Sequence, residues 1–364
     1  MSECFFFLSL LRMCSIIQAN INVNEENEAV CSDPACVERY AQLERRLQAL
    51  ETKVEDRLFI ADILESSSTD SGVPSGHSAA TNGGAFYDEV RHQIISVYRE
   101  SNNCRDIYIT HLTDPFHGTN EVRRNVIPFD VKLRVPIYDG CRFAYFAESG
   151  WNDGEVICGR RFGRVDLDTF SFEELPPIPA DPFQMFASVF YGCYHHGVVF
   201  MSDGESQLCG YDVERGIWKR YGITLPTIPR SDLEKYRHGT LISDPDDPMH
   251  LYLLSSYARP GFCRIDLEAR TCTLLSPSPR RGTFDCYDSV LVRSRPGSDS
   301  FVIVVWGIGS SWHMWSSKTH KWKALSDWKE PQADRRRHFL VYAPDTKTFY
   351  YRVNGRSTWE AVKL

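Results

Sequence analysis

The feature that most constrains this chain is a short motif that returns four times between residues 164 and 326. Each copy reads as an apolar strand, a polar turn and a second apolar strand. The aligned turn residues lie 46, 54 and 50 positions apart and are Asp166, Asp212, Asp266 and Ser316. Six positions after each turn residue comes another shared position, occupied by Phe172, Trp218, Cys272 and Trp322.

A further apolar run precedes each copy of the motif, beginning at Phe143, Gly197, His250 and Phe301. Each unit of about 50 residues therefore contains the strands of two hairpins, which is the period of a β-propeller blade. One such sheet cannot bury both of its faces alone, so blades stack in a ring. The sequence predicts an all-β propeller over residues 85–364.

The last stretch of the chain, residues 338–364, contains three apolar runs separated by turn residues. Three terminal strands without a partner would leave exposed edges that invite aggregation. We therefore expect this stretch to close the ring by pairing with a strand from Phe86–Tyr98, so that both ends of the domain share one blade. The blade count is five, or six if Cys104–Phe129 makes its own blade.

A helical pattern occupies residues 37–64, before the propeller. Its apolar residues recur at steps of three and four, and only Arg57 interrupts them; the central ones are Tyr40, Leu43, Leu47, Leu50 and Val54. Such a seam over about four heptads predicts a coiled coil and hence a homo-oligomer. The alternative is a lone amphipathic helix that packs on its own domain.

Polar segments flank this helix. Residues 20–36 form an acidic linker that holds Cys31 and Cys36, and Cys36 falls at a core position of the heptad. Facing chains would bring these cysteines together, so interchain disulfides are expected in an oxidising compartment. Residues 65–84 are rich in Ser and Gly, which predicts a flexible spacer.

The first 19 residues are apolar but are interrupted by Arg12, and they are too short for a stable membrane span. Their apolar core and Ala19 suit a secretory signal peptide, although the usual basic start is missing. A cleaved signal, an uncleaved anchor and a wrongly assigned start all stay open. A net charge of −7 and a pI near 5.9 argue against a nucleic-acid-binding protein.

No nucleophile with its base, metal cluster or phosphate loop stands out, so no enzyme is predicted. His195 and His196 are adjacent, and neighbouring residues of a strand point to opposite faces. We therefore predict a turn role for them. Trp312 and Trp315 belong to a tryptophan-rich segment and are candidates for an interaction surface, the alternative being core stacking between blades.

The closing stretch resembles the end of the olfactomedin domain, in its residues Tyr342, Pro344, Lys347, Phe349, Tyr350, Asn354, Gly355, Trp359 and Val362. Similar segments lie upstream in the family's order: Ser188–Gly192, Cys209–Pro226 and Leu241–Ser255. The resemblance implies a five-bladed propeller in an extracellular protein whose parts are a signal, a coiled coil, a spacer and the propeller. Kelch propellers would show a Gly-Gly pair in each blade, whereas the one pair here, Gly83-Gly84, lies in the spacer.

The resemblance also implies a Ca²⁺ site in the central channel, at Thr240, Asp288 and Val341. Only Asp288 offers a carboxylate, and Ca²⁺ takes six to eight oxygen ligands. We therefore expect Asp288 to be a weak remnant of that site and expect no cofactor, with bound calcium the less favoured alternative.

Together these features predict a secreted, non-enzymatic protein–protein interaction module. Its coiled coil would oligomerise the chain, and its propeller would bind matrix or cell-surface proteins. The alternative is a cytoplasmic, kelch-like propeller adaptor in which the apolar N-terminus is no signal. A propeller enzyme is the third and least favoured hypothesis.

Overall fold

The computed structural model describes the backbone of residues 34–65, 69–74, 83–98, 105–112, 119–129, 131, 136–148, 150–152, 155–157, 160–179, 191–202, 208–223, 239–255, 261–277, 286–293, 300–306, 311–325, 338–353 and 358–363. The chain divides into two units, residues 1–57 and 58–364. No helix among the described residues is long and apolar enough to cross a membrane.

Helix α2 spans Pro34–Glu65, which confirms the predicted helix. In the part of the helix whose side chains are described, Val37, Tyr40, Leu43 and Leu50 are each more than half exposed. Leu47 and Val54 are partly exposed. This described part of the helix therefore presents an apolar stripe to solvent in the single chain.

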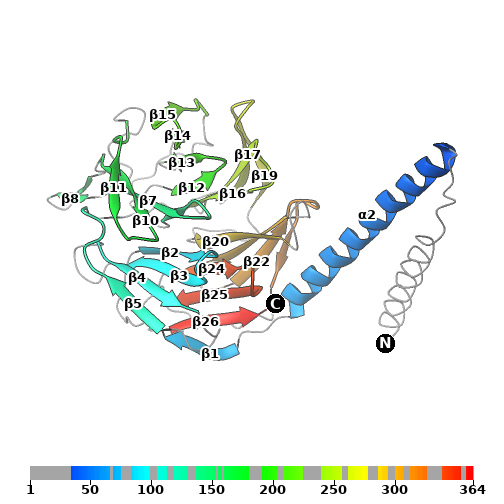
Figure 1. Cartoon of the computed structure of the whole chain (residues 1–364), viewed down its shortest axis with the longest axis horizontal. Coiled ribbons are helices and arrows are strands. Elements are labelled where there is room, and N and C mark those ends of the chain that lie inside the picture. Colours follow the sequence, from blue (N-terminus) through cyan, green and yellow to red (C-terminus); the bar gives the residue numbers. More distant parts are fainter. Residues whose placement is uncertain are drawn as a thin grey trace. The chain divides into compact units, whose positions relative to one another are not determined.

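Six four-stranded antiparallel sheets follow, which makes a six-bladed propeller (Figure 1). Blade 1 contains β2 (Gly83–Asp88), β3 (Gln93–Tyr98), β4 (Ile107–His111) and β5 (Thr119–Arg123). Blade 2 contains β6 (Ile137–Tyr138), β7 (Phe143–Ala147), β10 (Phe162–Asp166) and β11 (Phe172–Leu175), with the small hairpin of β8 (Gly150–Asn152) and β9 (Glu155–Ile157) inserted. Blade 3 contains β12 (Tyr191–His195), β13 (Val198–Ser202), β14 (Leu208–Asp212) and β15 (Ile217–Arg220).

The remaining blades repeat this plan. Blade 4 contains β16 (Gly239–Ser243), β17 (His250–Ser255), β18 (Gly261–Asp266) and β19 (Thr271–Pro277). Blade 5 contains β20 (Cys286–Arg293), β21 (Ser300–Trp306), β22 (Ser311–Ser316) and β23 (Trp322–Ala324). Blade 6 contains β24 (His338–Ala343), β25 (Thr348–Val353) and β26 (Thr358–Lys363), with β1 (Thr69–Pro74) as its outermost strand.

The first strand of each blade lies innermost. Neighbouring first strands contact one another from β6 through β12, β16, β20 and β24 to β2. Between blades 1 and 2 the rings of Phe86 and Tyr138 stack with centroids 4.6 Å apart. The fourth strand of each sheet is consequently its outer edge.

The ring closes through a different strand from the one predicted. Residues 338–364 do supply three strands of the closing blade, but their partner is β1, whose Val73 pairs with Trp359 (Figure 1). Phe86–Tyr98 instead begins blade 1, with β2 paired to β3. The expected spacer 65–84 therefore contains a structural strand, and Cys104–Phe129 contributes the outer half of blade 1. The alternative of six blades is confirmed and five is wrong, but Cys104–Phe129 does not make a blade of its own.

The repeat seen in the sequence is confirmed residue by residue. The residue six positions after each turn residue lies on the fourth strand of its blade. It pairs with the third-strand residue that comes directly before the turn residue. The pairs are Val165–Phe172, Tyr211–Trp218, Ile265–Cys272 and Trp315–Trp322. These residues fill the junctions between blades. Phe162 of blade 2 packs on Trp218 of blade 3, and Phe262 of blade 4 packs on Trp322 of blade 5.

The two tryptophans proposed as an interaction surface lie in these junctions. Trp312 and Trp315 are each 1% exposed. Trp315 contacts Phe262 of blade 4, and Trp312 contacts Tyr351 of blade 6. The surface interpretation is wrong for this pair, since an indole that fills a blade junction cannot also reach a partner, and core stacking accounts for both.

Candidate functional site

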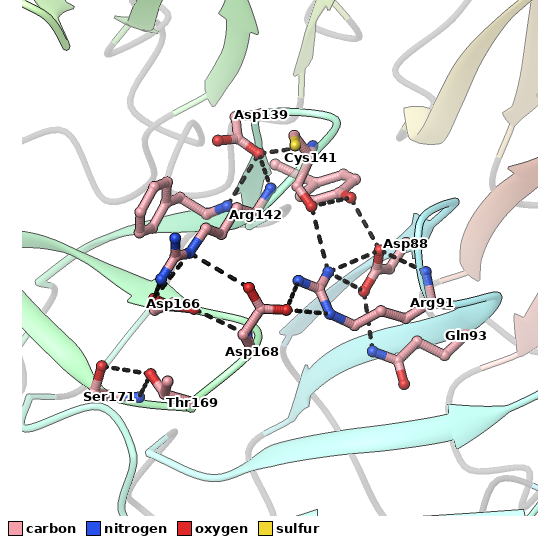
Figure 2. A network of polar contacts seen from close by, with 12 residues as sticks. Asp88, Arg91, Gln93, Asp139, Cys141, Arg142, Asp166, Asp168, Thr169 and Ser171 are labelled. Atoms are coloured by element: carbon pink, nitrogen blue, oxygen red, sulfur yellow. Dashed lines mark hydrogen bonds and ion pairs between the residues drawn. The ribbon is translucent and has the colours of Figure 1, made fainter.

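Polar side chains gather where the turns of blades 1 and 2 meet (Figure 2). The β2–β3 turn contributes Asp88 and Arg91, and the β10–β11 turn contributes Asp166 and Asp168. Arg142 comes from the turn before β7. We call these five residues the blade 1–2 network.

Asp88 lies at the centre of this network with no exposed surface. Its carboxylate accepts hydrogen bonds from the Arg91 guanidinium at 3.0 Å, from Gln93 Nε2 at 3.0 Å and from the Tyr138 hydroxyl at 3.0 Å. Burial and the negative charge of Asp88 both raise the pKa of Tyr138. Because Tyr138 belongs to blade 2, this buried carboxylate joins two blades.

Arg91 extends the connection. Its guanidinium donates to Asp88, to the carbonyl oxygen of Cys141 at 3.3 Å and to Asp168, where Nε lies 3.2 Å from Oδ1. Burial by itself lowers the pKa of Arg91, but the hydrogen bonds to Asp168 and Asp88 outweigh it, so the pKa is raised. The guanidinium thus stays charged and bridges the two turns.

Arg142 and Asp166 form the outer part of the network. Arg142 Nε lies 3.0 Å from Asp166 Oδ2, and this hydrogen bond is the main reason that the pKa of Asp166 is lowered. The backbone N–H of Asp168 also donates to Asp166. Each carboxylate of the network faces a guanidinium, which suits a structural connection between the turns.

A second polar contact joins blade 1 to blade 6. The Tyr87 hydroxyl donates to Asp345 Oδ2 at 2.8 Å, and His92 Nδ1 lies 2.7 Å from the same oxygen. Burial and then the hydrogen bond to Asp345 raise the pKa of Tyr87. The β2–β3 hairpin therefore holds blade 6 on one side and blade 2 on the other.

A third contact joins blades 3 and 4 through His195, which is 3% exposed. Its Nε2 lies 3.1 Å from the carbonyl oxygen of Pro248, so Nε2 must carry the proton and donate. Its Nδ1, 2.9 Å from Ser243 Oγ, then accepts from that hydroxyl. Burial lowers the pKa of His195. The hydrogen bond to the Pro248 carbonyl and the negative charges of Asp247 and Asp244 oppose this shift, but burial outweighs them.

The assumption that His195 and His196 are neighbours on one strand holds only for His195. His195 ends β12, whereas His196 lies in the following turn with a φ of +46°. The strand rule does not apply to that turn, and the two rings meet edge to face with centroids 4.6 Å apart. The predicted turn position is confirmed for His196.

The three residues implied as a calcium site all lie on innermost strands of their blades. Thr240, Asp288 and Val341 lie on the innermost strands β16, β20 and β24. Val341 is 3% exposed, and the side chain of Asp288 lies outside the described side chains. In the part of the chain that the structure describes, no three His, Cys, Asp or Glu residues are grouped so that they could hold a metal ion. The remnant role of Asp288 stays a prediction.

The cysteine predictions fall largely outside the described part. Cys31 is not described, and Cys36 lies in α2 with a side chain that is not described. Cys141, Cys193, Cys209, Cys263 and Cys272 are thiols, so no disulfide is formed among these five. Of these, Cys141 is exposed.

Sequence reasoning missed Asp88, Arg91, His92 and Asp345, although a signal was present. Asp88 opens a turn whose fifth residue, His92, has a φ of +50°. The repeat motif has the same arrangement, with Phe170 four residues after Asp166 at a φ of +54°. Extending that turn pattern to Tyr87–Gln93 would have placed Asp88 at a blade turn.

No family model matches the sequence, and no curated protein matches it. Among solved structures, the chain is similar to a structural genomics protein of unknown function from Bacteroides thetaiotaomicron, at 7% identity and a TM-score of 0.57 over 82% of this chain and 74% of that one. A weaker likeness is to the β-propeller domain of Cps50 (Swd1) from Myceliophteria thermophila, at 11% identity and a TM-score of 0.46 over 82% of this chain and 99% of that one. At such identities the first likeness supports the fold alone.

Proposed function

We propose that this protein is an oligomeric, non-enzymatic interaction module in which helix α2 joins copies of the chain and the propeller binds protein partners. The observation that carries the proposal is the exposed apolar stripe of α2. Tyr40, Leu43 and Leu50 are 58%, 59% and 52% exposed in the single chain. Their heptad spacing is that of a coiled-coil seam, so a second copy of the helix would bury them.

The polar sites of the propeller support a binding role over catalysis. In the blade 1–2 network each carboxylate is neutralised by an arginine, and the buried His195 faces a backbone carbonyl. These groups are used to hold blades together. A rigid ring of this kind, presented several times by a coiled coil, gains avidity for a repeated partner.

The compartment is part of the proposal. The olfactomedin resemblance and the signal-like N-terminus favour secretion, and an oxidising environment would link chains through Cys31 and Cys36. One observation favours the cytoplasmic adaptor as the second candidate. Cys141 is an exposed thiol, which secreted proteins usually avoid and the reducing cytosol tolerates.

The oligomer is tested in the full chain with Leu43→Glu and Leu50→Glu combined. Light scattering after size exclusion should show an oligomer for the natural chain and a smaller species for the double variant. The matched control, Gln42→Glu with Ala49→Glu, adds the same two carboxylates to exposed helix positions outside the stripe. A natural chain that has the same mass as the double variant would refute the helix-mediated oligomer.

The compartment needs a separate experiment. Expression in a secretory cell line, followed by reducing and non-reducing gels of medium and lysate, distinguishes the two candidates. Protein in the medium with disulfide-linked chains supports the extracellular module. Protein confined to the lysate as free thiols supports the adaptor.

A further inference from the structure

Two cysteines occupy neighbouring positions in the outer hairpin of blade 4. Cys263 lies on β18, three residues before the turn residue, and Cys272 lies on β19, six residues after it. Cys263 pairs with Leu274, and two positions along the ladder Ile265 pairs with Cys272. Side chains of an antiparallel pair alternate between the two faces of the sheet. Cys263 and Cys272 are therefore diagonal neighbours on the same face.

The same diagonal pair of positions is in contact in blade 2. There the two positions hold Gly163 and Phe172, with Gly163 paired to Glu174 and Phe172 paired to Val165. A Cβ added to Gly163 would collide with Cζ of the Phe172 ring. The side chain at the second position therefore reaches across to the first, and the repeat brings the two positions together.

Blade 4 differs from the other three copies of the motif in having a thiol at both positions. An aromatic ring occupies the second position in the other copies, and in blades 3 and 5 this ring is an indole that packs on the preceding blade. The corresponding pairs are Gly163 with Phe172 in blade 2, Cys209 with Trp218 in blade 3 and His313 with Trp322 in blade 5.

The two thiols of blade 4 interact with each other. A hydrogen bond from the Cys272 thiol lowers the pKa of Cys263, although burial opposes this shift. The same hydrogen bond, and then burial, raise the pKa of Cys272. Cys263 is buried in the apolar cluster of blades 3 and 4, and Cys272 packs on that cluster while staying partly exposed. The pair is therefore a dithiol that solvent reaches through Cys272.

The spacing of the two positions argues against a direct disulfide. Diagonal neighbours across an antiparallel pair have Cα atoms about 7–8 Å apart, whereas a disulfide usually joins Cα atoms about 4.4–6.8 Å apart. Cys263 and Cys272 are both thiols in the structure. An ion held between two sulfurs spans a wider gap than an S–S bond, so the same pair suits a metal bridge better than a covalent one.

We propose that Cys263 and Cys272 bind a soft, thiol-seeking metal ion, with Cu(I) as the ion that fits best. Soft thiolate ligands favour Cu(I), which two sulfurs on opposite sides can hold. A structural zinc ion takes four ligands. Among the residues that the structure describes, no group of three His, Cys, Asp or Glu residues offers such a set.

Binding at this site replaces the two S–H protons by the ion, so two protons are released and the copper stays Cu(I) throughout. The resulting dithiolate complex carries one negative charge. Partial exposure of Cys272 lets water solvate that charge, which a fully buried pair would not allow.

The first test is a competition for Cu(I) with the full chain, reduced and kept free of oxygen. The chain is titrated with the coloured Cu(I)–bicinchoninate complex, and loss of colour reports transfer of the ion. Because the chain has twelve cysteines, the readout is the difference between variants. Cys263→Ala and Cys272→Ala should each lose one equivalent of bound Cu(I), and the double variant should lose no more than either, since both thiols hold one ion.

Cys209→Ala is the matched control. Cys209 is a buried thiol at the same repeat position as Cys263, but its neighbour at the second position is Trp218. This variant should bind as much Cu(I) as the natural chain. An equal loss in Cys209→Ala and Cys272→Ala, or no loss in Cys272→Ala, would overturn the proposal. Circular dichroism verifies the fold, and the partly exposed Cys272 provides the test if Cys263→Ala fails to fold.

A second measurement uses the natural chain alone. The chain is alkylated with iodoacetamide in the presence and absence of the Cu(I)–bicinchoninate complex, and the labelled cysteines are mapped by peptide mass. The ion should abolish labelling of Cys272 and leave the exposed Cys141 labelled. Equal labelling of Cys272 in both samples would refute the metal site. A Cys263–Cys272 disulfide that forms in aerated, metal-free solution would do so too, because the sulfurs would then bond directly.

Discussion

At the scale of single residues, three buried or partly buried polar contacts connect neighbouring blades. Asp88 joins blades 1 and 2, Asp345 joins blades 6 and 1, and His195 joins blades 3 and 4. These contacts sit among junctions that are otherwise apolar. Since a buried charge without its partner is costly, such residues make the correct neighbour of each blade specific as well as stable.

Replacing Asp88 should destabilise the propeller strongly. Asp88→Ala leaves the guanidinium of Arg91, the Gln93 amide and the Tyr138 hydroxyl without their shared acceptor, and we expect a loss of about 3 kcal/mol in the free energy of unfolding. Asp168→Ala, at a side chain that is 54% exposed, should cost less than about 1 kcal/mol. Urea unfolding measures both. If both variants lose the same free energy of unfolding, the burial of Asp88 does not determine how much it stabilises the propeller.

His195 gives the protein a pH dependence of defined sign. Because the pKa of His195 is lowered in the folded state, the unfolded state binds the proton first as pH falls below about 6.5. The contribution of His195 to the free energy of unfolding is therefore fully present above that pH. Below it the contribution is lost, by at most about 1.4 kcal/mol per pH unit. Urea unfolding at pH 7.5 and 5.5 should show a smaller loss for His195→Gln than for the natural chain. If the natural chain and His195→Gln lose the same free energy of unfolding between these pH values, His195 is not the source of the pH dependence.

At the scale of elements, the outer hairpins follow one local rule. Asp166, Asp212 and Asp266 each accept a backbone N–H from the turn that they open, and Ser316 does so through its hydroxyl. The fifth residue of each turn is left-handed, with φ from +54° to +68°: Phe170, Gly216, Arg270 and His320. This rule acts within a few residues, and for that reason the four-fold motif could be read from the sequence before any tertiary contact was known.

The left-handed position can be tested by exchanging residues between blades. Gly216→Ala should lower the free energy of unfolding by about 0.5–1 kcal/mol, since only glycine adopts this φ without strain. Arg270→Gly should raise it by a similar amount, and Arg270→Ala, which keeps a Cβ in place, should have little effect. A Cβ at position 216 finds its nearest neighbour at an ordinary 3.7 Å, so crowding does not confuse the result. Thermal and urea unfolding provide the comparison.

At the scale of the whole molecule, the ring depends on a strand that comes from far away in the sequence. Strand β1 pairs with β26, and without it the edge of β26, including the backbone at Trp359, would be open. Closure joins the first and last strands of the domain, so opening of blade 6 would expose the apolar contacts that it makes with blades 1 and 5.

Replacing Thr69–Pro74 by a Gly/Ser segment of equal length should therefore destabilise the entire propeller. We expect a loss of about 2–4 kcal/mol, from several ladder hydrogen bonds and the cover over β26. Replacing residues 75–80 in the same way is the control and should change little. Thermal unfolding followed by circular dichroism measures the effect, and an unchanged midpoint in the first variant would show that β1 is dispensable.

The sequence by itself determined the propeller class, the four outer hairpins with their cross-strand pairs and the amphipathic helix. Each of these depends on periodicity or on turn chemistry within a few positions of the chain. Only the tertiary structure decided the number of blades, the closing strand β1, the burial of Trp312 and Trp315 and the partners of Asp88 and His195. Those outcomes depend on which sheets meet across the ring, and sequence spacing carries no information about contacts between blades that lie tens or hundreds of residues apart.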